Sequence, residues 1–275
     1  IEMREAVIVS GARTPIGKAY RGAFNNLESP SMASVAVKAA VDRSGIDPKE
    51  VDDCIMGAAI QQGTQGFNLG RQVAMASGLP VSVAGMTIDR QCSSGLMTIA
   101  TGAKHIINDN APITIAGGCE SISLVQNEHM NSHRIGDPLT IKNAPMIHMP
   151  MLDTAETVAK RYNISREAQD EYAVASQDRT ADAQVRGAFD DEIVPVTAIK
   201  MIMNKETGEV TKEEVTLTKD EGNRPRSRRP VRQPDWCEIL GGTCFMKNHA
   251  TCVSLCGKKK DTSVFRRETL LLHVL

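Results

Sequence analysis

The sequence predicts an α/β fold in which a mixed, mainly parallel sheet is layered with helices and carries an inserted loop subdomain. Aromatic residues make up only 3% of the 275 residues while 41% are apolar, a composition that suits helices packed closely on sheets. Short apolar runs of strand length also alternate with segments of helical periodicity, which is typical of right-handed crossovers between parallel strands. A chain of this length can bury a sizeable core.

The first part of the chain contains four expected strands and three expected helices. Each strand is a short apolar run closed by a glycine or an acidic residue, and the helices have small or apolar side chains at helical spacing. The strands are expected within 6–15, 51–57, 83–89 and 111–118, and the helices within 31–45, 70–78 and 96–107. In the last helix, the apolar spacing predicts a buried stripe made of Leu96, Ile99, Ala100, Ala103 and Ile107.

A polar stretch with several methionines and prolines follows, from about residue 120 to 150, and we expect it to run over the edge of the sheet. Two helices are predicted after it, within 154–162 and 165–187. The second opens with Ser165 as a candidate N-cap and Glu167 in its first turn. Two further runs, 191–199 and 213–220, are candidate strands of the inserted subdomain.

The chain changes character near residue 224. Before it, 21 Lys and Arg stand against 29 Asp and Glu, and from it onward 11 stand against 4. Four of the seven cysteines crowd this end, and five arginines lie between 224 and 232 without sustained periodicity. We therefore predict three regions: residues 1–120, a core half with a candidate nucleophile; residues 121–225, the loop subdomain; and residues 226–275, a disordered tail.

Composition also bears on location. No run of eighteen apolar residues occurs, and the N-terminus lacks the basic and then apolar order of a secretory signal. An odd number of cysteines without such a signal argues against a disulfide framework. We expect a soluble cytoplasmic protein. An organelle stays open because the chain begins with Ile rather than Met.

One cysteine stands out because of its place between a strand and a helix. In "TIDRQCSSGLMTIATGAKHII", Cys92 follows an expected strand and precedes a helix with a slim first turn. The unpaired N–H groups and positive end of a helix favour a thiolate over a thiol. Cys92 is therefore a candidate nucleophile, with its own N–H as one oxyanion donor. The alternative, a small buried core cysteine, is the more common role for a lone cysteine.

The chain resembles the thiolase family continuously from about Arg4 to Pro225. The blocks that carry this resemblance are "REAVIVSGARTPIGKAYRGAF", "GFNLGRQVAMASGLP", "QCSSGL", "AGGCESIS", "MLDTAETVAKRYNISREAQDEYAVASQDR", "DDEIVPV" and "KDEGNRP". The resemblance implies a thiolase-like architecture and an acyltransferase of fatty acid metabolism. In such an enzyme a CoA thioester acylates Cys92, and the acyl-enzyme then undergoes Claisen condensation with a second CoA-bound acetyl group. The reverse reaction is thiolysis of a 3-ketoacyl-CoA.

The same resemblance implies further residues and partners. Met151 matches a position that lines the pantetheine tunnel, and Arg224 matches a basic residue near the CoA nucleotide. The expected partners are acyl-CoA or acetyl-CoA as substrate, with no separate cofactor. An intact family member is expected to be a homo-oligomer, with neither nucleic acid nor membrane as a partner.

The sequence departs from the family after Pro225. The Asn-Glu-Ala-Phe, Gly-His-Pro and Cys-x-Gly-Gly-Gly motifs of the family's second half do not occur in it. The change of composition is typical of a shifted reading frame, and a natural short paralogue is the alternative. We therefore expect a truncated chain that is weakly active or inactive alone. The competing function is a non-catalytic CoA-binding or dimerising fragment.

Two weaker patterns involve metal ligands. His129 and His133 lie four residues apart but in an irregular polar stretch without a third ligand, and the tail set of Cys244, His249, Cys252 and Cys256 fits no standard finger spacing. We expect no metal site. The basic tail lacks the interleaved aromatic residues of a nucleic-acid-binding platform.

Overall fold

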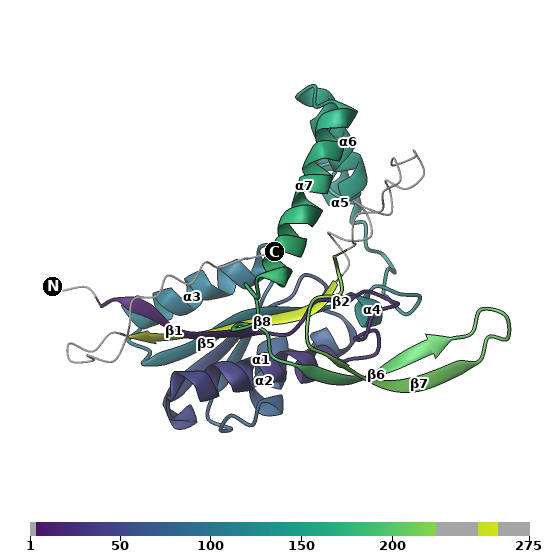
Figure 1. The fold of residues 1–275 in the computed structure, drawn as a ribbon. Helices are drawn as coiled ribbons and strands as arrows, with labels where there is room; N and C mark the ends of the chain where they lie inside the picture. The colour runs from purple at the N-terminus through teal and green to yellow at the C-terminus, as the bar shows by residue number, and fades with distance from the viewer. Residues whose placement is uncertain (1–3, 224–246, 258–275) are drawn as a thin grey trace. The chain divides into compact units, whose positions relative to one another are not determined.

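The computed structural model describes residues 4–223 and, by its backbone, the strand 247–257 (Figure 1). The described residues form two compact units. The first consists of residues 4–128, 190–222 and 247–257, and the second of residues 129–189 with Asn223.

A sheet of six strands forms the centre of the first unit in the part of the chain that is described. Its order is β1 (Ala6–Arg13), β8 (Lys247–Gly257), β5 (Ile113–Ser121), β3 (Val51–Gly57) and β4 (Ala84–Ile88), and the short β2 (Gly17–Lys18) pairs with β8. β3 runs parallel to both β4 and β5, whereas β8 runs antiparallel to β1, β2 and β5. The predicted mixed sheet is confirmed.

Three helices cover the two faces of this sheet. α1 (Ser29–Ser44) and α2 (Leu69–Ala76) pack together on one face, and α3 (Ser94–Asn108) packs on the other (Figure 1). All three match expected helices, and α1 ends where Gly45 adopts the left-handed conformation that glycine favours. Short helical turns, η1 (Pro48–Glu50), η2 (Gly63–Gln65) and α4 (Ile122–Val125), lie in the connections.

The main core lies between the sheet and the pair α1 and α2. Small and medium apolar side chains dominate it, which explains how a chain so poor in aromatic residues packs closely. The largest fully buried members of this cluster are Phe24, Met32, Met56, Leu69, Ile115, Val37, Val73 and Val83.

The buried face of α3 differs from the predicted stripe. Leu96 is 50% exposed and Ile107 is 37% exposed, whereas the buried residues are Ser94, Thr98, Gly102 and Ile106. The prediction was wrong at Leu96, Ala100 and Ile107, which are exposed, whereas Ile99 and Ala103 are partly buried and pack against a cluster of buried apolar side chains. The fully buried positions of the helix hold Ser94, Thr98 and Gly102 together with Ile106, and the small residues among them let the helix approach the strands closely.

The second unit contains α5 (Pro138–Asn143), α6 (Met151–Arg161) and α7 (Arg166–Val185). The two predicted helices are confirmed, and the Ser165 Oγ caps α7 by accepting a hydrogen bond from the Ala168 N–H at 3.2 Å. None of the residues of α6 is buried, and Ala173 is the buried residue of α7. The described part of this unit therefore has little core of its own.

The two predicted strands after the helices form a hairpin of β6 (Val196–Met203) and β7 (Val210–Leu217). The hairpin belongs to the first unit, whereas the sequence predicts 121–225 as one loop subdomain. Val196 and Ala198 are buried in the core of the first unit, and the Asn25 side chain pairs with both backbone groups of Met201. These contacts explain why the inserted segment ends at 189 and not at 225.

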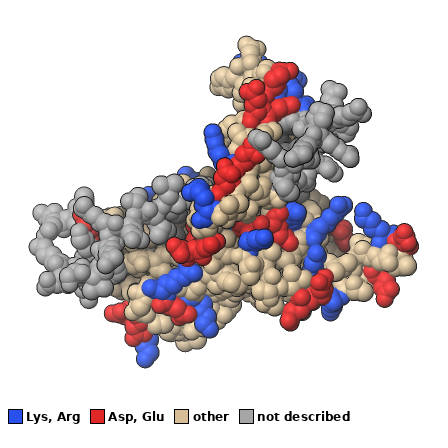
Figure 2. Space-filling model, in the orientation of Figure 1, with Lys and Arg blue, Asp and Glu red and all other residues tan. Residues whose placement is uncertain are grey.

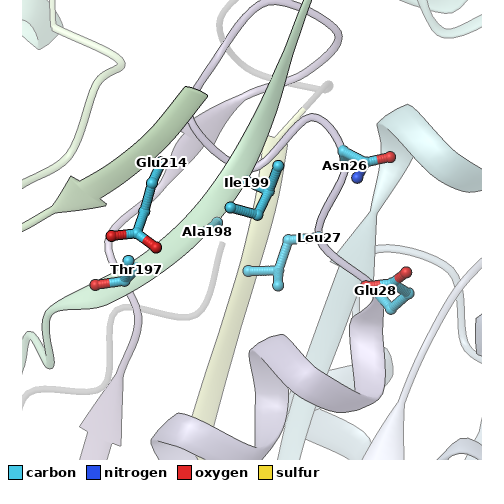
Figure 3. A pocket seen from close by; sticks show the side chains of 7 residues that line it. All are labelled: Asn26, Leu27, Glu28, Thr197, Ala198, Ile199 and Glu214. Atoms are coloured by element: carbon cyan, nitrogen blue, oxygen red, sulfur yellow. The ribbon is translucent and has the colours of Figure 1, made fainter. Parts of the chain in front are cut away.

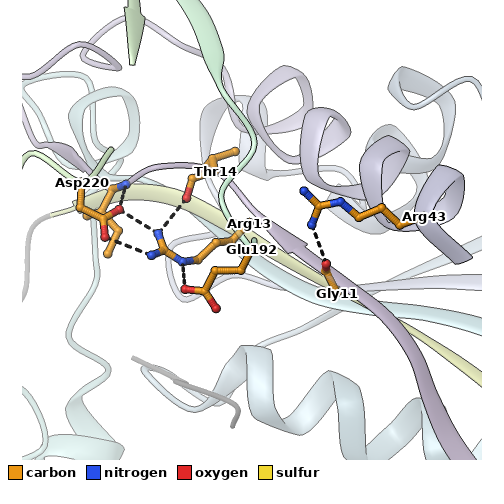
Figure 4. Close-up of polar contacts among 7 residues, drawn as sticks. Gly11, Arg13, Thr14, Arg43, Glu192 and Asp220 are labelled. Atoms are coloured by element: carbon orange, nitrogen blue, oxygen red, sulfur yellow. Dashed lines mark hydrogen bonds and ion pairs between the residues drawn. The ribbon is translucent and has the colours of Figure 1, made fainter. Parts of the chain in front are cut away.

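Residues 190–222, which we call the returning segment, are anchored to the first strand by two acidic residues. Arg13 makes two hydrogen bonds to the Asp220 carboxylate, at 2.8 and 3.0 Å, and a third to Glu192 at 2.7 Å (Figure 4). Asp220 also accepts a hydrogen bond from the Ile16 N–H at 2.8 Å. Burial opposes the charge of Arg13, but these hydrogen bonds raise its pKa above the usual value.

The predicted disordered tail also needs a correction at residues 247–257. The structure places them as β8, a central strand between β1 and β5. The physical reason is that β1 and β5 each present an edge of unpaired backbone groups, which a strand far along the chain satisfies on both sides. Residues 226–246 and 258–275 lie outside the described residues.

Thr114 on β5 offers a test of packing in this sheet. Its side chain is fully buried, and its Oγ1 has no hydrogen-bond partner among the described residues. We expect Thr114→Val to stabilise the protein by about 1 kcal/mol, because it removes a buried hydroxyl that is not hydrogen bonded. Urea unfolding measures this as a higher midpoint at an unchanged slope.

Thr98 is the matched control for that substitution. Thr98 is buried as fully as Thr114, but its hydroxyl donates a hydrogen bond to the Gly117 carbonyl at 2.9 Å. Thr98→Val should therefore destabilise the protein by about 1 kcal/mol. An equal loss of stability in both variants would contradict the assignment of Thr114 as an unpaired hydroxyl.

Candidate active site around Cys92

The candidate site lies where the parallel strands β3, β4 and β5 end. Ligand sites of open α/β sheets form at this carboxyl edge, since the connections that follow the strands gather there. Cys92 stands four residues after the last residue of β4 and two before the first residue of α3. The predicted place between strand and helix is therefore confirmed.

The segment 89–94, the Cys92 turn, is held by its own side chains. Asp89 accepts a hydrogen bond from the Gln91 N–H at 2.7 Å. The Ser94 hydroxyl accepts one from the Arg90 N–H at 2.8 Å and donates one to the Gln91 carbonyl at 2.6 Å. Gln91 has a φ of 49°, a left-handed conformation that costs about 1 kcal/mol or more in a residue with a side chain. The turn is thus fixed in the conformation that presents Cys92.

Glycines seat the first turn of α3 directly on the strand ends. A Cβ atom on Gly57 would lie 2.5 Å from the Ser94 carbonyl carbon, and one on Gly118 would lie 3.2 Å from the Gly95 Cα. The Thr98 hydroxyl adds the polar contact to the Gly117 carbonyl on β5. The start of the helix therefore has a defined position relative to β3 and β5, and Cys92 takes its position from it.

Burial separates Cys92 from the other cysteines whose side chains are described. Cys92 is exposed, whereas Cys54 and Cys119 are buried. Burial, together with the charge of Asp53, raises the pKa of Cys54 to about 12, and burial together with Glu120 raises the pKa of Cys119 well above its usual value. Of these three thiols, Cys92 is accessible to a substrate, and the other two stay protonated in the core.

Sequence reasoning missed two polar residues at the same edge. Glu120, near the end of β5, accepts a hydrogen bond from the Ala59 N–H at 2.8 Å and another from Gln65. Gln65 is fully buried within η2. Each is a single polar residue, Glu120 near the end of a buried strand and Gln65 in a glycine-rich loop. A single residue of this kind forms no periodic pattern, so the sequence gives no signal that the two are paired.

The other predicted site residues lie elsewhere. Met151 is the first residue of α6 in the second unit, and its side chain is 54% exposed. Arg224 lies outside the described residues. His129 and His133 are exposed in the second unit, and the described residues contain no group of three His, Cys, Asp or Glu side chains placed to hold a metal ion. The roles of Met151 and Arg224 stay predictions.

A second feature of the first unit is an open pocket of about 300 Å³ at the base of the β6 and β7 hairpin (Figure 3). Its lining residues are Asn26, Leu27, Glu28, Thr197, Ala198, Ile199 and Glu214. None of them belongs to the Cys92 turn, and they include no cysteine. The pocket is therefore separate from the candidate site.

Surface charge and hydropathy add two findings. On the face seen in Figure 2, acidic and basic side chains of the described residues are interspersed rather than gathered by sign. This face thus shows no basic stripe of the kind that follows a nucleic-acid backbone.

Within 4–223 and 247–257, no helix has the length and apolar character needed to cross a membrane.

Comparison with protein families and curated proteins gives one consistent match. The model of the thiolase N-terminal domain matches residues 6–229. A 3-ketoacyl-CoA thiolase of Bacillus subtilis is 37% identical over 266 residues, covering 94% of this chain and 67% of the relative. An acetyl-CoA acetyltransferase of Cupriavidus necator is 40% identical over 206 residues, covering 70% of this chain and 51% of the relative.

The human peroxisomal 3-ketoacyl-CoA thiolase is 34% identical over 264 residues, covering 93% of this chain and 60% of the relative. Among solved structures, the acetyl-CoA acetyltransferase of Bacillus anthracis matches with a TM-score of 0.69 and 31% identity, covering 93% of this chain and 66% of that one. The chain thus spans about half to two thirds of the length of these proteins. A match over 94% of the chain also includes part of residues 226–275, beyond the blocks that carry the sequence resemblance.

Proposed function

The chain belongs to the thiolase family, and we propose that it is the nucleophile-bearing part of an acyltransferase in which Cys92 accepts an acyl group from a CoA thioester. The observation that carries the proposal is an exposed thiol fixed just before α3, at the carboxyl edge of three parallel strands. Relatives that match this chain are named thiolases and acetyl-CoA acetyltransferases.

In the proposed step, the Cys92 thiolate attacks the carbonyl carbon of the thioester and forms a new C–S bond. The bond between that carbon and the CoA sulfur then breaks, and CoA leaves as a thiolate that takes a proton from water. The backbone N–H of Cys92 is the candidate donor to the oxygen that becomes negative during attack.

Condensation makes a further demand that this sequence does not meet. Deprotonating a second acetyl group requires a general base, whose contribution is typically about 10²–10⁴-fold. The Gly-His-Pro and Cys-x-Gly-Gly-Gly motifs implied by the resemblance are absent from the 275 residues. We propose that the chain alone takes up an acyl group at Cys92 but does not complete condensation or thiolysis.

The proposal extends to the substrate and its contacts. A CoA thioester is the substrate, with no resident cofactor, and Met151 and Arg224 are the proposed contacts to pantetheine and to the CoA nucleotide. A homo-oligomer is proposed for the intact family member. Relatives include bacterial and peroxisomal proteins, so the cytoplasmic location stays a proposal.

Incubation with acetyl-CoA followed by mass spectrometry tests this function. We expect one acetyl group on the peptide that contains Cys92, no acetyl group on that peptide in Cys92→Ala, and no acetoacetyl-CoA above background. Binding of acetyl-CoA without acetylation would favour the non-catalytic CoA-binding fragment. Repeated turnover to acetoacetyl-CoA would show that another residue supplies the base.

A further inference from the structure

Glu120 fixes the segment that follows β3 at the carboxyl edge. Its Oε2 accepts a hydrogen bond from the Ala59 N–H at 2.8 Å, its Oε1 accepts one from the Gln65 Nε2, and the Ile60 N–H also donates to the carboxylate. A carboxylate can accept all three hydrogen bonds because it has only acceptor sites. An amide in its place would turn an N–H₂ group toward at least one of these donors.

Gln65 cannot adjust to such a change. Its Oε1 accepts hydrogen bonds from the Ser29 hydroxyl and the Ser121 N–H, both at 2.6 Å. Its Nε2 donates to the Ile60 carbonyl at 2.8 Å as well as to Glu120. Each of its four hydrogen-bonding positions is occupied in a fully buried site, so the amide orientation is fixed and presents a donor to Glu120.

The same segment is connected to the Cys92 turn. The Ala58 N–H donates to the Ile88 carbonyl at the end of β4, with a distance of 3.2 Å. The next residue along the chain, Asp89, holds the Gln91 N–H. Glu120 and the Cys92 turn are therefore linked through two neighbouring strand ends, each step being a hydrogen bond or a peptide bond.

We propose that Glu120 is a positioning residue for Cys92. The ionised carboxylate of Glu120 holds the segment after β3 against β4, and this segment in turn holds the Cys92 turn in place. The proposal rests on Cys92 as the reactive thiol of the proposed function, but it does not depend on acyl transfer. It deepens that function by naming a residue that acts through the turn and does not touch the substrate.

The surroundings of Glu120 shift its pKa away from that of an exposed glutamate. Burial raises its pKa above the usual value, and the charge of Asp89 raises it further, although the hydrogen bonds from Ala59, Gln65 and Ile60 oppose this. Of the described residues, Asp89 after β4 and Cys119 on β5 itself are the titratable groups that interact with it. Segment 58–65 after β3 contributes backbone N–H groups and Gln65, none of which titrates.

The test is the pH profile of Cys92 alkylation by iodoacetamide in the full chain, followed by peptide mapping from pH 4.5 to 8. The wild type should show, besides the ionisation of the thiol, a second inflection above pH 4.5 at which the rate rises about threefold or more. Glu120→Gln should remove this inflection and lower the rate at pH 7. The exposed Glu50→Gln is the matched control and should keep the wild-type profile.

Three results overturn the proposal: a wild-type profile with the thiol ionisation alone, a second inflection that persists in Glu120→Gln and so belongs to another group, or an unchanged rate in that variant. Should Glu120→Gln fail to fold, Glu120→Asp and the wild-type profile decide, since a retained charge should preserve the inflection. Alkylation needs no CoA. An intact inflection without acetylation therefore counts against the proposed function alone.

Discussion

We expect iodoacetamide to alkylate Cys92 at least about 100-fold faster than Cys54 or Cys119 in the folded protein, because reaction at a buried thiol requires local opening that costs about 3 kcal/mol or more. Cys92 is exposed before α3, whereas Cys54 and Cys119 are buried. Burial also raises the pKa of Cys54 to about 12, so its thiolate is scarce at neutral pH. Peptide mapping by mass spectrometry at increasing times gives the three rates.

Unfolded protein provides the control for this measurement. In guanidinium chloride the three cysteines should react at similar rates, since neither burial nor a helix end then distinguishes them. Equal rates for Cys92 and either buried cysteine in native buffer would contradict the exposed position of the thiol. They would also remove the physical basis for its role as nucleophile.

The second large effect is expected at the anchor of the returning segment. Asp220→Ala should destabilise the protein by about 3–5 kcal/mol, because it leaves the Arg13 guanidinium buried without its main partner. The side chains of Arg13 and Asp220 are only 13% and 10% exposed, and both nitrogens of the guanidinium fork contact the carboxylate (Figure 4). Urea unfolding of the wild type and the variant measures the loss.

Two further variants separate the ion pair from general packing. Glu192→Ala removes the second carboxylate that contacts Arg13. The Glu192 side chain is 38% exposed, so this substitution should cost about 1 kcal/mol or less. The double variant Arg13→Leu with Asp220→Leu should be more stable than Asp220→Ala, because no charge stays buried alone. A loss below about 1 kcal/mol in Asp220→Ala would contradict the anchoring role.

Four strands and the three longer helices of the first unit could be predicted from the sequence because their ends carry local signals. Glycine closes α1 at Gly45, and the apolar run 51–57 coincides with β3. The position of Cys92 follows from the same signals, since it needs a strand end and a helix start in immediate succession. Each of these features is decided within a few residues along the chain.

The features that could not be predicted from the sequence depend on contacts between residues that are far apart along the chain. The apolar stripe predicted for α3 is wrong at Leu96, Ala100 and Ile107, because Gly57 and Gly118 on the strands let the first turn of the helix approach and small residues take buried positions. β8 went unpredicted because its partners, β1 and β5, lie more than a hundred residues away along the chain. Glu120 and Gln65 are single polar residues whose pairing appears only when β3 and β5 lie side by side.

Acyl exchange between CoA molecules tests the central claim most directly, namely that Cys92 accepts an acyl group from a thioester and returns it. The protein is incubated with acetyl-CoA and isotopically labelled CoA, and label in acetyl-CoA is followed by mass spectrometry. An acyl-enzyme at Cys92 predicts transfer of label in the wild type and none above the rate without enzyme in Cys92→Ala. Equal rates of label transfer in the wild type and in Cys92→Ala would contradict it.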